Sequence, residues 1–445
     1  MSRTFSTGGI HPHDHKISVN ASIEDFPLMD MAYISVSQHL GAPAEPVVAK
    51  GDQVKVGQLI AKASGFISAN IHSSVSGTVT AVEPLPDISG NLINHIVIKV
   101  EGDEWEESID RSPEIVKEIK ASPKEIIDII AKSGIVGLGG AAFPTHIKLS
   151  PPPGKTAEYL LINGAECEPY LTSDYRVMLE YPEQMLIGTK IMMMALGVAK
   201  AYIGIEENKP KALKLLKKIA SKSYKDIKVV SLKKRYPQGG EKQLIDAILH
   251  RQVPSMGLPI DVGVVVQNVG TAFAVYEAVQ KNKPLFDGIV TVTGGCMTEQ
   301  RNFRLRVGTN FERIMFAIGG FPKDAVKLIS GGPMMGKAIS RMDAATVKST
   351  SALLLLTDEE TRRGEEGNCI RCAKCVDACP MGLEPYLLNR LARAGRIDDL
   401  ETNLIQDCIE CGCCFYSCPS NIPLLDTIRL AKGQVLRIIR SRPKK

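Results

Sequence analysis

The chain has 445 residues, of which 44% are hydrophobic, and a formal net charge of +5. A chain of this length exceeds a single hydrophobic core, so we expect about three domains. The small net charge and the aromatic content of 5% give no support for nucleic-acid binding.

No stretch of the sequence predicts a membrane-spanning helix, because no apolar run of about 18 residues lacks a charge. The nearest candidate, "MLIGTKIMMMALGVAKAYIGI", carries Lys190 and Lys200 and is interpreted as a buried helix followed by a strand. The opening "MSRTFSTGGIHPHDHK" lacks the apolar core of a signal peptide. We therefore expect a protein that stays in the reducing cytoplasm.

Residues 1–30 are taken as an N-terminal segment, and residues 31–105 predict a small β-rich unit. The stretch "VVAKGDQVKVGQLIAKASGFISANIHSSVSGTVTAV" alternates short apolar runs with Gly-Asp and Ser-Gly turns. It resembles the barrel-sandwich hybrid of biotinyl and lipoyl domains, which attach their cofactor to a lysine at one tip. The matching tip, residues 68–72, has no lysine. We expect a docking or structural module.

Residues 113–285 predict an α/β domain. The stretch "SPEIVKEIKASPKEIIDIIAKSG" contains two Ser-Pro helix starts, and "EYLLING", "AKAYIGI" and "IKVVSL" are predicted strands separated by helical segments. Such alternation is typical of an α/β layer. The glycine-rich "SGIVGLGGAAFPTHIKL" is either a flexible connection or a turn that lets backbone N–H groups approach a phosphate or a flat ring.

Polar residues follow the predicted strands of this domain, where α/β folds bind ligands. They are Asn163, Glu166 and Glu168 in "LINGAECEPYLTSDYR", Gly239, Gly240 and Glu241 in "RYPQGGEKQLI", and Gln267, Asn268 and Thr271 in "VVVQNVGTAFAV". The carboxylates are either ligand contacts or ordinary surface groups. Residues 286–350 predict a β-grasp module, with strands at "GIVTVTGG" and "RNFRLRVG" and a helix capped by Asn310.

Residues 351–445 contain two copies of one cysteine motif, separated by 39 residues. The copies are "CIRCAKCVDACP" from Cys369 and "CIECGCCFYSCP" from Cys408. Three cysteines spaced C-x2-C-x2-C wrap one [4Fe-4S] cube, and the fourth, before proline, ligates the other cube in two-cluster ferredoxins. The predicted ligands are Cys369, Cys372, Cys375 and Cys418 for the first cluster, and Cys408, Cys411, Cys414 and Cys379 for the second.

Zinc is the alternative metal, but structural zinc sites use two separated cysteine pairs. The remaining cysteines, Cys167, Cys296 and Cys413, are expected to be small buried residues. Between the motifs, "EPYLLNRLARAGRIDDLETNLI" predicts two helices joined by a turn. The basic tail from Ile428, which includes Lys444 and Lys445, is either a solvated helix or a contact for an anionic membrane surface or acidic partner.

The segment "GLGGAAFPTHIK" resembles the glycine-rich "GRGGAGFPTGLKW" of the flavin-bearing NADH subunit of respiratory complex I and related hydrogenase diaphorases. "NGAECEP" and "QNVGTAFAV" resemble two further motifs of those proteins. The whole chain, with its N-terminal "GGIHPHDHK" and twin cysteine motifs, resembles the RnfC family, the peripheral subunits of Rnf ferredoxin:NAD+ oxidoreductases. At Ala165, Cys167, Leu149, Gln267 and Lys242 the sequence departs from the complex I motifs.

The resemblance implies FMN and NAD(H) bound in the α/β domain. Gly137, Gly139, Gly140 and Lys148 match the flavin loop, and Phe143 matches an aromatic available for stacking on the nucleotide. Asn163, Glu166 and Glu168 match the acidic loop near flavin and nicotinamide, Glu241 matches a further acid, and Asn268 and Thr271 match contacts to the flavin phosphate. No residue is expected to act as a catalytic acid, base or nucleophile.

The expected fold is multidomain α+β: a barrel-sandwich hybrid, an α/β flavin/NADH domain, an SLBB-like β-grasp module and a helical two-cluster ferredoxin domain. The expected function is electron exchange between NAD(H), through FMN, and two [4Fe-4S] clusters. The resemblance implies membrane subunits of the Rnf complex as partners, ferredoxin-type carriers through that complex, and the cytoplasmic face of the bacterial inner membrane. Two alternatives are a soluble diaphorase and a cluster-wiring subunit without its own nucleotide site.

Overall fold

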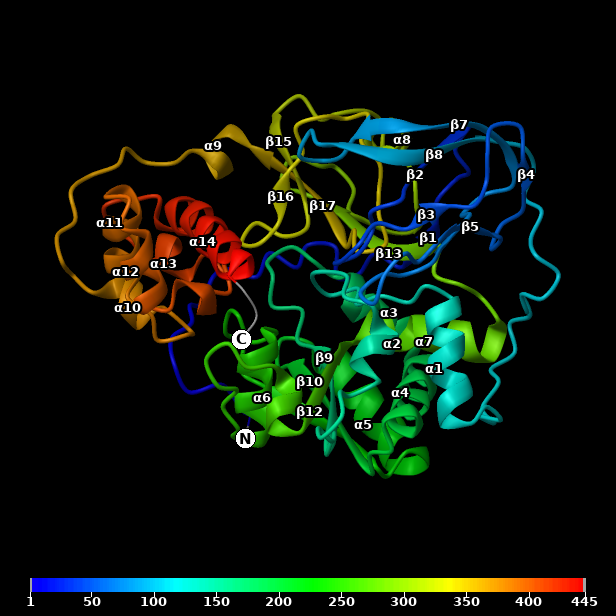
Figure 1. Cartoon of the computed structure of the whole chain (residues 1–445), viewed down its shortest axis with the longest axis horizontal. Helices are drawn as coiled ribbons and strands as arrows, with labels where there is room; N and C mark the ends of the chain where they lie inside the picture. The colour runs from blue at the N-terminus through cyan, green and yellow to red at the C-terminus, as the bar shows by residue number, and fades with distance from the viewer. Residues whose placement is uncertain (1, 443–445) are drawn as a thin grey trace.

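The computed structural model describes residues 2–442, which contain four β-sheets and a separate group of helices (Figure 1). The helical group lies at one end of the molecule and follows an extended connection after the short helix α9 (Asp358–Thr361). Among the helices of residues 2–442, none combines the length and the apolar character needed to cross a membrane.

The α/β domain is built on a parallel four-stranded sheet with strand order β11-β10-β9-β12. Its strands are β9 (Tyr159–Gly164), β10 (Lys200–Glu206), β11 (Ile227–Leu232) and β12 (Val264–Asn268). Its helices are α1 (Pro123–Lys132), α2 (Thr145–Lys148), α3 (Ser173–Glu180), α4 (Pro182–Leu196), α5 (Pro210–Ser223), α6 (Glu241–Leu249), the 3-10 helix η1 (Pro259–Val262) and α7 (Val269–Lys281). The three strands predicted from the sequence are confirmed.

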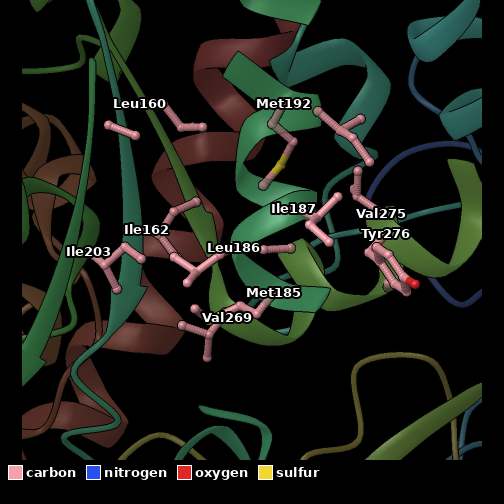
Figure 2. Close-up of a cluster of buried hydrophobic side chains, with 14 of the residues drawn as sticks. Leu160, Ile162, Met185, Leu186, Ile187, Met192, Ile203, Val269, Val275 and Tyr276 are labelled. Carbon is pink, nitrogen blue, oxygen red and sulfur yellow. The ribbon is translucent and has the colours of Figure 1, made fainter. Parts of the chain in front are cut away.

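Both faces of this sheet are covered by helices. Successive residues of β9 point to opposite faces, so their side chains pack with two different sets of helices. Leu160 and Ile162 pack with residues of α4 and α7, whereas Leu161 packs with residues of α6. Figure 2 shows Ile162 beside Leu186 of α4 and close to Val269 of α7. The continuous apolar pattern of the strands follows from this double coverage.

The first predicted Ser-Pro helix start is wrong, because residues 111–121 form no helix. Three of their carbonyl groups accept hydrogen bonds from side chains of α7 instead. Lys281 Nζ donates to the carbonyl oxygen of Ser112 at 3.3 Å, and Gln280 Nε2 donates to those of Val116 and Glu118 at 3.0 and 2.9 Å. The second start is correct: Ser122 caps α1.

Residues 31–100 form two small antiparallel sheets around one apolar core. One sheet has the order β2-β8-β7-β4 and the other β3-β5-β6. The strands are β2 (Met31–Ser35), β3 (Glu45–Pro46), β4 (Gln53–Val54), β5 (Leu59–Lys62), β6 (Ile71–His72), β7 (Gly77–Pro86) and β8 (Leu92–Val100). This paired arrangement agrees with the predicted β-rich unit.

A six-stranded mixed sheet covers the region predicted as a β-grasp module, with strand order β1-β14-β13-β17-β15-β16. Its elements are β1 (Ile23–Asp25), β13 (Asp287–Thr293), β14 (Arg301–Arg306), α8 (Phe311–Ala317), β15 (Ala325–Ser330), β16 (Lys337–Ala338) and β17 (Ala352–Thr357). The expected cap of α8 is present, since the Asn310 side chain accepts from the Arg313 amide.

This sheet extends beyond the predicted boundary at residue 350. β17, placed in the ferredoxin-type domain from the sequence, lies between β13 and β15. Its five apolar residues from Ala352 to Leu356 are buried, which requires cover on both faces. β1, placed in the N-terminal segment, pairs with β14.

The helical group consists of α10 (Lys374–Asp377), α11 (Pro385–Arg393), α12 (Ile397–Thr402), the 3-10 helix η2 (Ile405–Asp407), α13 (Cys413–Tyr416) and α14 (Leu424–Ser441). The predicted helix pair between the motifs is confirmed as α11 and α12. Three basic residues of the tail form ion pairs: Arg429 and Lys432 with Glu410, and Arg442 with Glu401. Lys444 and Lys445 lie outside the described residues.

Candidate functional site

The strand order of the α/β sheet creates a crevice at the carboxyl ends of β9 and β12. From β9 the chain proceeds through β10 to β11 on one side of β9, and it then returns to β12 on the other side. Ligands of open α/β sheets bind at such a point of reversal. Asn163 and Asn268 are direct neighbours at this edge, as the register of the two strands shows.

The glycine-rich loop that precedes α2 is attached to the start of α7. The Leu138 amide donates to Thr271 Oγ1 at 3.0 Å. Gly139 lies against Asn268, so that a Cβ atom there would be 2.8 Å from Asn268 Nδ2. Gly140 has open space around the corresponding position. The loop is therefore held at one end and accessible at the other.

Asn268 and Thr271, expected to contact a flavin phosphate, already have protein partners. Asn268 Oδ1 accepts from the amides of Gly270 at 2.7 Å and Thr271 at 3.3 Å, and so caps α7. Asn268 Nδ2 donates to Asp174 Oδ2 at 2.7 Å. These residues hold the glycine-rich loop and the helix start in place.

Asp174 is part of the crevice, although it is not among the predicted site residues. Burial, followed by the negative charge of Glu166, raises its pKa to about 7. It begins α3 only a few residues after the acidic loop, and an acid in a first helical turn could have signalled it. Its proximity to Asn268 depends on the tertiary structure.

The acidic loop after β9 is bound on several sides. Glu166 has a left-handed backbone with φ of +46°, and its Oε1 accepts from the Asp174 amide at 2.8 Å. Its other oxygen, Oε2, is buried without a hydrogen-bond partner in the described chain. Glu168 accepts from the Met334 and Met335 amides at 3.1 and 2.8 Å, which ties the loop to the β-grasp region. Burial raises the pKa of Glu168 to about 7.

The other predicted nucleotide residues surround the same edge. Lys148 donates to Glu241 at 2.7 Å and to the Val266 carbonyl at 3.2 Å. Phe143 closes the glycine-rich loop, because its carbonyl accepts from the Gly137 amide at 2.9 Å. Asn163 Nδ2 donates to the Gly239 carbonyl at 2.9 Å. The structure thus brings the glycine-rich, acidic and Gly239 loops to one edge of the sheet.

This edge fits a polar ligand such as FMN. The amide nitrogen Gln267 Nε2, on β12, is buried without a hydrogen-bond partner among residues 2–442. Buried donors of this kind are costly unless a ligand or water satisfies them. Gly140 leaves room for close approach to the backbone. A phosphate-bearing flavin requires hydrogen-bond donors that have no protein partner and a backbone that it can approach closely.

One of the two predicted cysteine sets combines residues of both motifs. Cys379 of the first motif lies with three cysteines of the second. The pKa of Cys414 is raised by burial and then by the neighbouring sulfurs of Cys408, Cys411 and Cys379. The pKa of Cys408 is raised to about 11, chiefly by burial, with smaller effects of Cys411 and Cys379. We name these four residues the second cysteine group.

The other predicted set is more exposed. Cys375 and Cys418 are partly buried against the same apolar core and interact electrostatically, whereas Cys369 and Cys372 are exposed. Among residues 2–442, no three His, Cys, Asp or Glu side chains are grouped closely enough to hold a single metal ion. Of the remaining cysteines, Cys413 is fully buried, while Cys167 and Cys296 are partly buried.

The residues around the second cysteine group fit thiolates bound to iron. The Glu410 amide donates to Cys408 Sγ at 3.4 Å. Burial raises the pKa of Cys379, and the backbone amides of Met381, Leu383 and Gly382 partly offset that increase. Amide donors stabilise negative charge on sulfur and adjust the potential of a cluster.

The second cysteine group lies directly against the α/β domain. The Tyr236 hydroxyl donates to the Cys411 carbonyl at 2.9 Å, and Tyr236 packs with Ile10, Ala378 and Cys413 in one apolar cluster. Cys167 of the acidic loop packs against the same cluster, and its Sγ accepts from the Gly239 amide at 3.4 Å. The crevice and the second cysteine group therefore share one boundary.

Comparison with known proteins identifies the family. The relative from Clostridium ljungdahlii is the C subunit of a proton-translocating ferredoxin:NAD(+) oxidoreductase complex. It is 48% identical over 388 residues, covering 87% of this chain and 84% of that one. The chain belongs to the RnfC family. The corresponding C subunits of the Na(+)-translocating complex of Acetobacterium woodii and the ion-translocating complex of Rhodobacter capsulatus are 41% and 40% identical. The first match covers 96% of each chain, and the second covers 96% of this chain and 82% of the other.

Four family descriptions match successive parts of this RnfC-family chain. They are the RnfC barrel sandwich hybrid domain at residues 4–103, the Nuo51 FMN-binding domain at 130–277, the SLBB domain at 289–338 and the 4Fe-4S dicluster domain at 363–422. The resemblance inferred from the sequence and the predicted four-module fold are both confirmed. The matches also support FMN and [4Fe-4S] clusters as cofactors.

Proposed function

We propose that this chain exchanges electrons between NAD(H) and two [4Fe-4S] clusters through FMN, as the peripheral subunit of an ion-translocating ferredoxin:NAD+ oxidoreductase. The observation that carries the proposal is the boundary at Tyr236. There the carboxyl edge of an FMN-type sheet meets four cysteines spaced for a cluster. A nucleotide site and a cluster site in contact are what electron transfer between them requires.

A bound flavin supplies the conversion between the two-electron hydride of NADH and the single electrons that each cluster accepts. We assign the flavin and nucleotide to residues 113–285, with Gly137, Gly139, Gly140 and Phe143 forming the loop beside it. Lys148, Asn163, Glu166, Glu168 and Glu241 line the same edge. Asn268 and Thr271 support that loop through their own hydrogen bonds.

The protein contributes position and charge rather than acid–base chemistry. The hydrogen bonds of Glu166 and Glu168 fix the acidic loop against α3 and the β-grasp region. We assign Cys369, Cys372, Cys375 and Cys418 to the first cluster, and the second cysteine group to the second. The second group lies nearer the crevice, so we place the second cluster between the flavin and the first cluster.

The relatives suggest the partners, because they are subunits of ferredoxin:NAD(+) oxidoreductase complexes. We propose that the chain docks on membrane subunits of such a complex at the cytoplasmic face of the inner membrane. Ferredoxin-type carriers would exchange electrons with it through that complex. Exposure of Cys369 and Cys372 supports an exit at the first cluster.

The test is purification of the full chain without oxygen, followed by extraction of flavin, determination of iron and acid-labile sulfide, and titration with NADH. We expect FMN, iron for two clusters, and bleaching of the clusters after addition of NADH. Absence of flavin together with unbleached clusters would reject the proposal in favour of a wiring role. Co-purification with integral membrane subunits distinguishes a component of such a complex from a soluble diaphorase.

A further inference from the structure

The N-terminal segment passes beneath the acidic loop of the crevice. Lys16 Nζ donates to the carbonyl oxygens of Glu166, Glu168 and Leu171 at 2.8, 2.8 and 2.6 Å. Its side chain is only 13% exposed. An ammonium group has three donors and no acceptor, and here all three are used on one loop.

Residues beside Lys16 reinforce this contact. The His15 ring stacks on Tyr170 with centroids 4.8 Å apart, and the Tyr170 amide donates to the Asp14 carbonyl at 2.9 Å. Ser18 Oγ lies 2.7 Å from Thr172 Oγ1 in a buried hydrogen bond. The loop that carries Glu166 and Glu168 is therefore fixed by residues that are distant in the sequence.

The same segment also contacts the second cysteine group. The Gly9 amide donates to the Ala378 carbonyl at 2.9 Å, and Ile10 exchanges two backbone hydrogen bonds of 2.8 Å with Tyr236. Gly8 has φ of +66°, and a Cβ atom there would be 2.3 Å from the Cys379 carbonyl oxygen. Only glycine permits this approach to a predicted cluster ligand.

Residues before Gly8 attach the segment to the α/β domain. Arg3 continues the sheet beside Leu232, with backbone hydrogen bonds to Ser231 and Lys233 of 2.9 and 2.8 Å. Phe5 is buried in the core beneath α6. The segment is thus fixed at its start, contacts the cysteine group in its middle, and supports the acidic loop near its end.

We propose that residues 3–18 form a strap that positions both redox sites: Lys16 sets the acidic loop of the crevice, and Gly8 sets the distance from the crevice to the second cluster. The inference rests on the proposed function and adds positioning residues that take part in no chemistry. NADH supplies two electrons and a proton as hydride, and the second cluster takes one electron at a time. The strap sets the positions of the acidic loop and of the second cluster, and so affects the rate of each transfer.

The lysine contact is tested with Lys16→Met, which keeps the length of the side chain and removes its donors. The control is Lys234→Met, because Lys234 pairs with Asp14 of the strap but is 41% exposed. We expect the dissociation constant for FMN, measured by fluorescence on flavin-free chain, to rise about tenfold. Amide exchange of residues 164–172 should accelerate in the same variant. Unchanged affinity and exchange would overturn this half of the inference.

The glycine contact is tested with Gly8→Ala against Gly197→Ala. Gly197 has φ of +68° with open space around it, so the control carries the same backbone strain without a clash. We expect stopped-flow measurements to show unchanged reduction of flavin by NADH. The subsequent bleaching of the clusters should slow on the order of 100-fold, since small misplacements at a reacting pair have large effects on rate. Equal rates in both variants would overturn this half.

A second variant covers the case in which Gly8→Ala fails to retain its clusters. Ile10→Ala removes packing next to Cys411 and Tyr236 and adds no clash. It should slow cluster bleaching in the same direction and accelerate amide exchange at residues 8–10. Normal exchange and normal bleaching would reject the strap. Because exchange is measured without NADH, the strap can fail or hold independently of the proposed electron transfer.

Discussion

The hydroxyl of Tyr236 donates a hydrogen bond of 2.9 Å to the carbonyl of Cys411. Tyr236 is buried and belongs to the loop that leads to Gly239 and α6, whereas Cys411 is in the second cysteine motif. This hydrogen bond joins the nucleotide-binding part of the chain to a predicted iron ligand. The position of the backbone at Cys411 therefore depends on a residue of another domain.

Tyr236→Phe should weaken the attachment of the helical group. Removal of the hydroxyl leaves the Cys411 carbonyl without this donor, at a cost of about 1–3 kcal/mol. We expect the cluster absorbance to be lost at a lower temperature when the loaded chain is heated without oxygen. Tyr416→Phe is the control, since Tyr416 is 52% exposed. A melting temperature equal to that of the control would contradict the prediction.

The interlocking of the cysteines predicts which pairs of substitutions act on one cluster. Cys379→Ala and Cys408→Ala should each remove about half of the iron, and the double variant should remove no more, because both residues serve one site. Cys379→Ala combined with Cys369→Ala should remove both clusters.

Iron and sulfide determination, with electron paramagnetic resonance of the reduced chain, checks these outcomes. Cys413→Ala provides the control and should retain both clusters. Loss of both clusters in the Cys379→Ala, Cys408→Ala pair would show that Cys379 ligates the first cluster with its own motif.

Asp174 predicts a dependence of stability on pH. Burial and then Glu166 raise its pKa to about 7, from an ordinary value of 3.8. The protonated form is favoured in the folded state, so this contribution is full below about pH 4 and is lost as the pH rises to about 7. The loss is at most about 1.4 kcal/mol per pH unit.

Asp174→Asn should remove this dependence while retaining an acceptor for Asn268. The melting temperature of the variant relative to the wild type should therefore increase from about pH 5.5 to about pH 7 and then level off, in flavin-free chain. Asp128→Asn on the exposed side of α1 is the control. A difference that does not change with pH would contradict the assigned pKa.

Gly188 predicts a large packing effect in the core of the α/β domain. A Cβ atom there would be 1.8 Å from the Ala272 carbonyl oxygen, where α4 and α7 are in close contact. Gly188→Ala should destabilise the domain by about 1–3 kcal/mol or more. Gly433→Ala in α14 has open space and should be neutral or stabilising by about 1 kcal/mol. Thermal unfolding of both variants is the measurement, and equal effects would refute the close contact.

Much of the architecture could be predicted, because its signals are local. The apolar pattern of "EYLLING" and the cap at Asn310 each specify an element within a few residues. The helix expected after Ser112 does not form, because contacts with a distant element outweigh the local signal. Lys281 and Gln280 of α7 donate hydrogen bonds to carbonyl groups of this segment.

The family and the modules could be recognised from the sequence alone, and the two cysteine sets could be predicted from it, because short motifs with fixed spacing impose their own ligand geometry. Three relationships become visible only in the folded chain: β17 completes the β-grasp sheet, Asp174 contacts Asn268, and Lys16 supports the acidic loop. These relationships join residues that are distant along the chain. They are stabilised by burial and by hydrogen bonds that form only when the chain folds. Short sequence patterns therefore carry no signal for them.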